Sequence, residues 1–345
     1  MAKESVGIAL SGGVDSTVAA CLLLEDGWDV TGFFMELAQP DLEHQRRRVT
    51  EIAARLGIEL RRIDLRDDFH KSVIAYLREQ YRLGLTPNPC VVCNREIKFG
   101  LLRRAMAAVG IKRMATGHYA RIRRDNGLSL LKGVDGRKDQ SYFLAALDPA
   151  QLDGLALPLG EYLKKDVFAM ALARGFSGFS GESQDVCFLA DGAVGDFLAD
   201  QLGENDGPIM TKEGRELGRH HGLFRYTVGQ RRGLGLPDAT PWYVVRLDWK
   251  KNAVIVGKND ELFCAGLTTS PARWLRRPAD FSGLFTTRIR SGHAGCLASI
   301  VADAADCLTI KFTESQRAVA PGQFAVIYHD DEVLGSAVID APLPC

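Results

Sequence analysis

Nine residues near the N-terminus have the types and order of an anion-binding turn. They read Ala9-Leu10-Ser11-Gly12-Gly13-Val14-Asp15-Ser16-Thr17, between an apolar run that predicts a strand and one that predicts a buried helix. Backbone N–H groups converge on an anion where a strand turns through glycines into a helix. The paired glycines let phosphate oxygens approach the backbone, and the three hydroxyls add donors. Because the lysine of a Walker A loop is missing, the sequence predicts another kind of nucleotide loop, with a ligand-free glycine turn as the alternative.

A second stretch places two thiols beside two prolines. It reads Thr86-Pro87-Asn88-Pro89-Cys90-Val91-Val92-Cys93-Asn94. The prolines predict an extended loop, and Asn94 is suited to cap a helix that begins near Ile97. A thiolate at such a helix N-terminus is stabilised, so Cys93 is a candidate nucleophile or metal ligand and Cys90 a candidate for either role. Zinc is the usual alternative for this spacing, but no second Cys-x-x-Cys or His pair completes a four-ligand site.

The remaining cysteines carry weaker signals. Cys187 follows a polar run and precedes Phe188 and Leu189, which leaves a functional thiol and a buried inert one equally open. Cys21 is expected in the core. The others have no ligand-like spacing; they are Cys264, Cys296, Cys307 and Cys345.

Several other polar stretches are placed to meet a nucleotide or an RNA. Gly117 and His118 follow a predicted strand directly, where a glycine permits close approach of a ligand. Residues 136–141 offer cations and an amide, and residues 225–233 mix aromatic, basic and glycine residues as many RNA surfaces do. In residues 288–290, strand alternation would place two guanidiniums on one face.

Composition narrows the class of protein. The chain has 345 residues, 46% of them hydrophobic, which suffices for two or three domains with cores of their own. It has no apolar run long enough to span a bilayer and no signal-peptide pattern, so a cytoplasmic protein whose eight cysteines are not structural disulfides is expected. Lys+Arg and Asp+Glu balance at 43 each, yet residues 95–124 are strongly basic and residues 185–206 acidic. The basic stretch suits a phosphate backbone or a solvated face equally.

The elements that position these residues alternate in the first part of the chain. Strands are expected at 6–10, 30–35, 58–63 and 112–116, with helical patterns between them that include 69–83 and 97–109. Such alternation predicts a parallel sheet with right-handed crossovers. Ligands bind outside the carboxyl ends of the strands, where Ser11, Met35 and Gly117 would meet.

The rest of the chain predicts different structure. A hairpin is expected around Asp125-Asn126-Gly127, followed by short helices. From residue 243 onward, short alternating strands suggest a small antiparallel barrel. The predicted fold is therefore α/β: a doubly wound parallel sheet with the nucleotide loop and the cysteines (1–200), a small central linking domain (201–260) and a C-terminal antiparallel β-barrel (261–345).

Seven motifs, in order, resemble the bacterial tRNA-specific 2-thiouridylases, a family of the pyrophosphate-loop ATPase superfamily. They are SGGVDST (11–17), TPNPCVVCNREIKF (86–99), TGHYA (116–120), KDQSYFL (138–144), ESQDVCFL (182–189), GRHHGLFRYTVGQRRGLG (218–235) and APGQFAVIY (320–328). The resemblance covers nearly the whole chain. It implies ATP-dependent replacement of the 2-oxygen of the wobble uridine (position 34) by sulfur in tRNAs for Lys, Glu and Gln, through adenylation of that oxygen.

The resemblance also implies roles for individual residues. ATP would be held by Ala9, Leu10, Ser11, Gly12, Gly13, Val14, Asp15, Ser16, Met35 and Gly117, with Asp15 reaching Mg²⁺. Cys187 would carry sulfur as a persulfide received from a sulfur-donor protein, and Cys93 would be the nucleophile that releases it, leaving a Cys93–Cys187 disulfide. The target base and the rest of the tRNA would contact Asn88, Pro89, Cys90, His118, Lys138, Asp139, Gln140, Arg288, Ile289 and Gln323.

One departure from the family keeps a second mechanism open. Some members have Asp where this chain has Cys90, so an acid or base at this position is in doubt. Cys90, Cys93 and Cys187 could instead ligate three irons of a [4Fe–4S] cluster, which is the alternative to the persulfide route. Two other classes remain as alternatives: a pyrophosphate-loop ligase or synthase for a small carboxylate, which needs neither Cys93 nor Cys187, and a non-catalytic RNA-binding protein.

Overall fold

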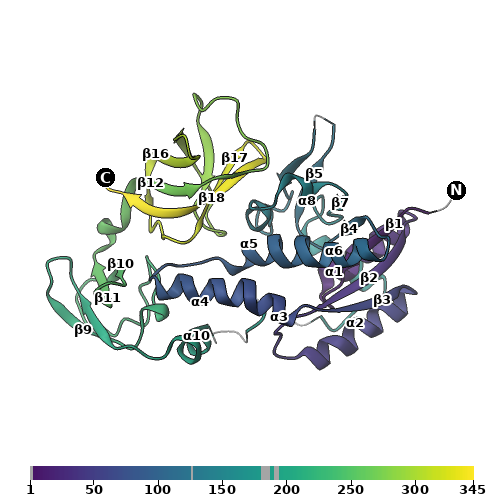
Figure 1. Cartoon of the computed structure of the whole chain (residues 1–345), viewed down its shortest axis with the longest axis horizontal. Helices are drawn as coiled ribbons and strands as arrows, with labels where there is room; N and C mark the ends of the chain where they lie inside the picture. Colours follow the sequence, from purple (N-terminus) through teal and green to yellow (C-terminus); the bar gives the residue numbers. More distant parts are fainter. Residues whose placement is uncertain (1–2, 126, 180–186, 190–193) are drawn as a thin grey trace.

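The computed structural model describes residues 3–125, 127–179, 187–189 and 194–345. The N-terminal part is a five-stranded parallel sheet in the order β3-β2-β1-β4-β7 (Figure 1). Its strands are β1 (Ser5–Ala9), β2 (Asp29–Glu36), β3 (Glu59–Asp64), β4 (Arg113–Ala115) and β7 (Leu155–Ala156). Strands β2 and β3 follow on one side of β1, and β4 and β7 lie on its other side. The switch point between β1 and β4 is where such sheets bind ligands.

Helices cover both faces of this sheet, which confirms the doubly wound fold. One core joins β1 and β2 to α1 (Val14–Glu25), α2 (Leu42–Leu56) and α9 (Lys164–Ala173). The other face is covered by two long helices, each interrupted by a π-helical segment. The first comprises α3 (Arg66–Phe69), η1 (His70–Ile74) and α4 (Ala75–Arg82); the second comprises α5 (Pro89–Cys93), η2 (Asn94–Leu102) and α6 (Arg103–Ala108).

The start of the second long helix differs from the prediction. It begins at Pro89, with Asn88 as its N-cap, and not near Ile97. The two prolines do not keep the whole stretch extended, because a proline is readily accommodated at the first helical position, where its missing N–H has no helical partner anyway.

The central part forms a small sheet of its own. Its strands are β8 (Gly207–Met210), β9 (Glu216–His220), β10 (Tyr243–Asp248) and β11 (Ala253–Gly257), in the order β10-β11-β8-β9. Strands β10 and β11 lie within the range predicted for the central domain, although the short alternating strands from residue 243 onward had suggested a barrel. Strand β10 pairs with β11, and β11 also pairs with β8. The helix α10 (Val194–Leu202) precedes this sheet.

The C-terminal part is a closed antiparallel barrel, as predicted. It contains β12 (Phe263–Pro271), β14 (Phe285–Arg288), β15 (Cys296–Ala302), β16 (Cys307–Arg317), β17 (Phe324–His329) and β18 (Glu332–Leu343). The barrel closes because β12 pairs with both β16 and β18. The predicted hairpin, β5 (Ala120–Arg123) with β6 (Ser129–Lys132), adds to β18 and thereby joins the N-terminal part to the barrel sheet.

The N-terminal part and the barrel also share a hydrophobic core. Phe324, Val326 and Tyr328 of β17 are buried in the same cluster as Val91 of α5 and Tyr142 of α7 (Ser141–Leu144). Within the described ranges, no helix is both long and apolar enough to cross a membrane.

Candidate active site at the sheet switch point

The loop after β1 has the geometry of an anion-binding turn. Gly12 has φ +83°, a left-handed conformation that favours glycine, and Gly13 is the N-cap of α1. The Ser16 and Thr17 hydroxyls, expected as donors to a ligand, both donate instead to the Gly13 carbonyl oxygen, at 3.1 and 2.9 Å. The backbone at the start of α1, together with the exposed Ser11, is what this turn offers to phosphate.

Gly117 follows β4 and packs directly on this loop. A Cβ built on Gly117 would lie 2.8 Å from the Asp15 carbonyl carbon and 2.9 Å from the Ser16 nitrogen. The glycine predicted to admit a ligand is therefore required by the close approach of the loop backbone. Met35 lies at the end of β2, where its carbonyl oxygen accepts a hydrogen bond from Gln39.

Asp15 is held by a cation that the sequence analysis missed. Lys164 Nζ lies 2.7 Å from both carboxylate oxygens of Asp15, and the Tyr119 hydroxyl donates to the same carboxylate at 2.7 Å. Lys164 is the first residue of α9, and its backbone N–H donates to Asp135 at 2.9 Å. A lysine in this helix carries no local sequence signal, because only the packing of α9 against α1 brings it to the loop.

The two cysteines of the Cys-x-x-Cys pair lie within the second long helix. Asn88 accepts a hydrogen bond from the Val91 N–H at 3.4 Å and caps this helix. Asn94, predicted as the cap, is buried in the continuous helix, and its amide donates to the Phe143 carbonyl oxygen at 3.1 Å. Cys93 is therefore not at a helix N-terminus, and that prediction was wrong.

The stabilised thiolate predicted for Cys93 is also absent from this structure. Burial raises the pKa of Cys93 to about 12 and that of Cys90 to about 11. The positive charge of Lys98 opposes the effect of burial on both pKa values without overcoming it. Both cysteines are therefore neutral thiols near pH 7 in this state.

Cys187 lies close to both of these thiols. A thiolate at Cys187 raises the pKa of Cys90 and of Cys93, which requires the three sulfur atoms to be near one another. All eight cysteines are free thiols, and Cys187 is an exposed residue. The tertiary structure thus brings together cysteines from two segments that are far apart in the chain.

Phe188 anchors the segment that carries Cys187. Its ring is buried, in edge contact with Phe69 at 5.2 Å and with Phe197 of α10 at 6.2 Å between ring centroids. Most of the preceding motif, from Glu182 to Val186, lies outside the described residues.

His118 follows Gly117 and lies near Lys98. Its Nδ1 lies 2.8 Å from the Thr116 hydroxyl oxygen, and its ring contacts Phe99 with centroids 5.7 Å apart. Burial, reinforced by the charge of Lys98, lowers the pKa of His118 well below its usual value, so the imidazole is neutral near pH 7. Lys98 therefore lies near His118 as well as near the cysteines.

Most residues expected to contact tRNA gather where the barrel meets the N-terminal part, and there they bond to the protein itself. Arg288 Nη1 lies 2.7 Å from the Asp139 carboxylate, with side chains 11% and 4% exposed. The Gln140 amide oxygen accepts from the Tyr119 N–H at 3.0 Å, and the Gln323 amide donates to the Thr86 carbonyl oxygen at 2.9 Å.

Ile289 and Lys138 complete this set. Ile289 is 1% exposed within the barrel core, and the Lys138 N–H donates to the Asp135 carbonyl oxygen at 2.9 Å.

The basic stretch is only partly a free surface. Arg103 donates to carbonyl oxygens of α8 (Pro149–Leu152), at 3.0 and 2.8 Å, and Arg124 to that of Leu155 at 2.9 Å. Arg121 pairs with Asp331, and Arg123 with Glu332, across the junction with the barrel. These arginines join parts of the protein, so the charge count overstates what is available to RNA.

The cysteines do not form a metal-binding set here. Among the described residues, no three His, Cys, Asp or Glu side chains are arranged to hold a metal ion. In the part of the chain that the structure describes, Cys90, Cys93 and Cys187 are not such a group for a single metal ion, and the iron–sulfur alternative stays a hypothesis.

Comparisons with known proteins agree over nearly the whole chain. Residues 4–191 match the family described as tRNA methyl transferase HUP domain, 195–258 its PRC-barrel domain, and 264–339 the aminomethyltransferase beta-barrel domain. The chain is 48% identical to a tRNA-specific 2-thiouridylase of Desulfotalea psychrophila, over 98% of this chain and 100% of that protein. It is 40% identical to one from Dehalococcoides mccartyi, over 98% and 97%, and 43% identical to one from Chloroflexus aurantiacus, over 98% and 99%.

Proposed function

Since the chain belongs to the tRNA-specific 2-thiouridylase family, we propose that it replaces the 2-oxygen of the wobble uridine with sulfur in tRNAs for Lys, Glu and Gln. The reaction consumes ATP and releases AMP and pyrophosphate. Its partners are the tRNA and a protein that donates persulfide sulfur. We propose that the protein acts in the cytoplasm, which contains both tRNA and ATP.

The first step is activation of the uridine. The 2-oxygen attacks the α-phosphorus of ATP, the bond to the β-phosphate breaks, and pyrophosphate leaves. The backbone from Ser11 to Asp15 would hold the phosphates, with Lys164 placed to neutralise charge that develops on them. A Mg²⁺ ion bound with ATP would share the Asp15 carboxylate with Lys164.

The second step transfers sulfur. The terminal sulfur of a Cys187 persulfide attacks C2 of the adenylated uridine, and AMP leaves with the former 2-oxygen. The Cys93 thiolate attacks the Cys187 sulfur and breaks the persulfide bond, so a Cys93–Cys187 disulfide forms that a reductant must reopen. Because Cys93 is a neutral thiol in this structure, a base or a change of surroundings must remove its proton once the substrate is bound.

One observation supports this proposal above the others: the thiols lie within reach of a charge that also acts on His118, next to the glycine that packs on the nucleotide loop. The charge of Lys98 acts on Cys90, Cys93 and His118, His118 follows Gly117, and Gly117 packs on Asp15. A ligase acting on a small carboxylate would use the loop without needing this thiol pair. In the proposed thiolation, Asn88, Pro89 and Cys90 would contact the target base; they lie at the start of the helix that carries Cys93.

The test is thiolation by aerobic, iron-free protein supplied with ATP, unmodified tRNA and a persulfide donor, followed by mass spectrometry of the nucleosides. We expect 2-thiouridine at position 34 and stoichiometric pyrophosphate. Asp15→Ala should abolish pyrophosphate release, Cys93→Ser should abolish thiolation while pyrophosphate is still released, and Cys90→Ser should keep substantial activity.

Other outcomes identify the alternatives. Turnover that appears only after iron and sulfide are added, with Cys90→Ser as damaging as Cys93→Ser, would establish the cluster mechanism instead. ATP cleavage that is independent of tRNA would point to a small-molecule ligase, and tRNA binding without ATP cleavage to an RNA-binding protein.

A further inference from the structure

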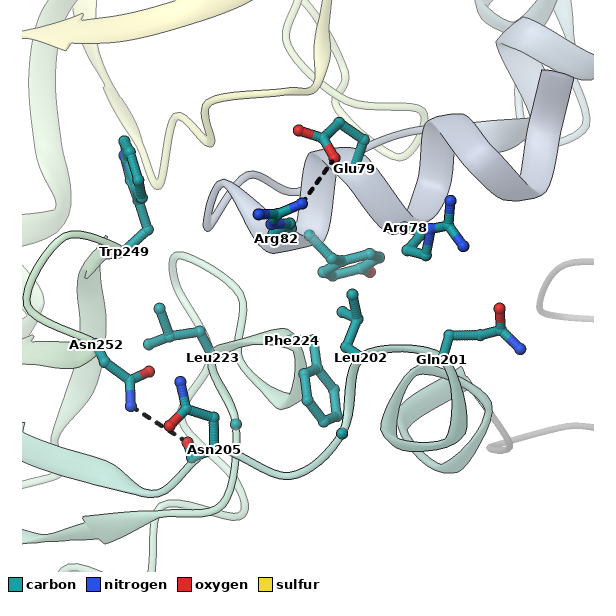
Figure 2. A pocket seen from close by; sticks show the side chains of 13 residues that line it. Arg78, Glu79, Arg82, Gln201, Leu202, Asn205, Leu223, Phe224, Trp249 and Asn252 are labelled. Atoms are coloured by element: carbon teal, nitrogen blue, oxygen red, sulfur yellow. Dashed lines mark hydrogen bonds and ion pairs between the residues drawn. The ribbon is translucent and has the colours of Figure 1, made fainter. Parts of the chain in front are cut away.

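A cavity of about 520 Å³ lies between the first long helix and the central domain (Figure 2), and its lining includes no cysteine and no residue of the nucleotide loop. Helix α4 contributes Arg78, Glu79 and Arg82, and helix α10 contributes Gln201 and Leu202. The central domain closes the other side, with Leu223, Phe224, Trp249 and Asn252.

The lining combines flat apolar surfaces with polar groups. Trp249 is exposed over 49% of its surface and Phe224 is buried, and both line the cavity. Arg82 pairs loosely with Glu79, at 4.0 Å, with side chains 75% and 56% exposed, so both groups remain accessible to a ligand.

Neighbouring contacts hold these groups in place. The Asn252 amide donates to the Asp206 carbonyl oxygen at 2.9 Å, which fixes one wall. A Cβ on Gly84 would lie 3.3 Å from the Trp249 Cβ, so the turn after α4 packs against the base of the indole. Lys250 follows Trp249, and its Nζ lies 5.7 Å from the centroid of the indole ring.

We infer that this cavity binds one unstacked nucleotide of the tRNA, separate from the uridine that reacts. This inference rests on the proposed function. Proteins recognise RNA by stacking exposed bases on aromatic or guanidinium planes and by hydrogen-bonding the base edges. Trp249 and Arg82 offer such planes, Glu79 and Gln201 offer acceptors and donors, and the exposed Arg78 offers a positive charge for a phosphate. A volume of about 520 Å³ is in the range of pockets that enclose a small ligand.

The position of the cavity suits a second contact with the same RNA. The helix that lines it continues through η1, which packs against α5, the helix of Cys90 and Cys93. A helix rises about 1.5 Å per residue, so Arg78 to Arg82, which line the cavity, lie roughly 5 to 11 Å along α4 from its first residue, Ala75. A nucleotide bound there would fix the orientation of the RNA on the enzyme.

The experiment measures binding of unmodified full-length tRNA to the whole protein, with ATP affinity measured in parallel. Trp249→Ala should raise the tRNA Kd roughly tenfold through lost stacking, and Trp249→Phe should restore most of the affinity. Arg82→Ala should reduce the slope of log Kd against log salt by about 1. Arg61→Ala, at a partly exposed arginine on the edge strand β3 that is also paired with a glutamate, is the matched control and should change neither quantity. Ultraviolet crosslinking should join a tRNA base to the peptide that contains Trp249.

The outcomes separate this inference from the proposed function. Wild-type protein that binds and thiolates tRNA, with both cavity variants binding normally and no crosslink at Trp249, would overturn the inference and leave the function intact. If the cavity variants bind tRNA normally but receive sulfur more slowly from a donor protein, the cavity is a protein-docking site, and the inference is overturned as well. Wild-type protein that binds no tRNA would overturn both.

Discussion

Lys164 and Asp15 form an ion pair at 2.7 Å beside the nucleotide loop. The Lys164 side chain is 12% exposed and that of Asp15 33%, so water screens the pair only partly. A buried ammonium that faces the loop is suited to stabilise charge on a departing pyrophosphate, where a preorganised cation acts most strongly. Under the proposed function, the pair would combine a structural contact with a chemical role.

We expect Lys164→Met to lower the rate of pyrophosphate release roughly 100-fold, because the cation at the loop is lost. Lys165→Met is the matched control, since its side chain is exposed and one residue away. Pyrophosphate release and thermal unfolding are measured for both variants. Equal rates in the two folded variants would remove Lys164 from the phosphate site.

The thiol of Cys93 gives a prediction about pH. Its pKa is raised to about 12 by burial, against about 9 in an unfolded chain. Alkylation of Cys93 by iodoacetamide, resolved by mass spectrometry, should rise about tenfold per pH unit without a plateau from pH 7 to the highest pH at which the protein stays folded. A plateau below pH 8 would show the stabilised thiolate that the sequence predicted.

The same shift affects stability, with a definite sign. Between pH 9 and 12 the unfolded chain loses the Cys93 proton while the folded chain keeps it, so the unfolded state binds fewer protons. Cys93 therefore lowers the free energy of unfolding as pH rises through this window and has no such effect below it.

At the scale of elements, the site depends on close packing between β4 and the loop after β1. Gly117 is the contact point, since its Cα faces the backbone of Asp15 and Ser16. The strand and the loop are far apart in sequence but adjacent in the sheet, because β4 pairs directly with β1. A side chain at this position has no room unless the loop moves.

Gly117→Ala should displace the loop and lower ATP affinity at least tenfold, while the protein remains folded. Gly136→Ala is the control, because a Cβ there meets no atom within 4 Å. Calorimetric titration with ATP measures the effect. Unchanged affinity in Gly117→Ala would mean that the loop conformation seen here is not the one that binds nucleotide.

The segment of Cys187 is held by a single aromatic anchor among the described residues. Phe188→Ala removes the ring that contacts Phe69 and Phe197, and burial of such a ring stabilises a fold by about 3–5 kcal/mol. We expect thiolation to fall much more than pyrophosphate release, because Cys187 loses its position while the nucleotide loop is untouched. Phe263→Ala, at a ring 40% exposed on the barrel, is the control. Parallel loss of both activities would instead indicate global unfolding.

At the scale of the whole molecule, the N-terminal part and the barrel act as one unit. They share a core, and β6 pairs with β18. Asp139 and Arg288 form a nearly buried ion pair across this junction, and Asp139 also accepts from the Gly133 and Ser141 N–H groups. The barrel therefore supports the helix of Cys90 and Cys93, besides any contact it makes with RNA.

Arg288→Met should destabilise the protein by about 3–5 kcal/mol, because it leaves the Asp139 carboxylate buried without its cation. Adding Asp139→Asn to the same chain should recover part of this loss, since the unpaired charge is removed. Urea unfolding of the single and double variants measures both effects. A single variant as stable as the wild type would mean that Arg288 serves substrate binding rather than the junction.

The sequence by itself determined the features that depend on neighbouring residues. The glycine turn after the first strand, the alternation of strands and helices, and the later series of short strands follow from local periodicity and turn chemistry, and the structure confirms the fold class. Local signals also misled at one place: Pro87 and Pro89 indicated an extended loop, but Pro89 begins a helix. Where this helix begins depends on whether Asn88 or Asn94 is its N-cap, and both residue types are good caps.

Only the tertiary structure decided the contacts between distant segments. Lys164 reaches Asp15 across 149 positions of the chain, and Arg288 reaches Asp139 across the same separation. Cys187 reaches Cys90 and Cys93 from a separate segment, and the surrounding side chains remove water from the thiols and raise their pKa values. Burial and long-range ion pairs result from how whole elements pack, and no periodicity within one element encodes which distant charge or ring will face it.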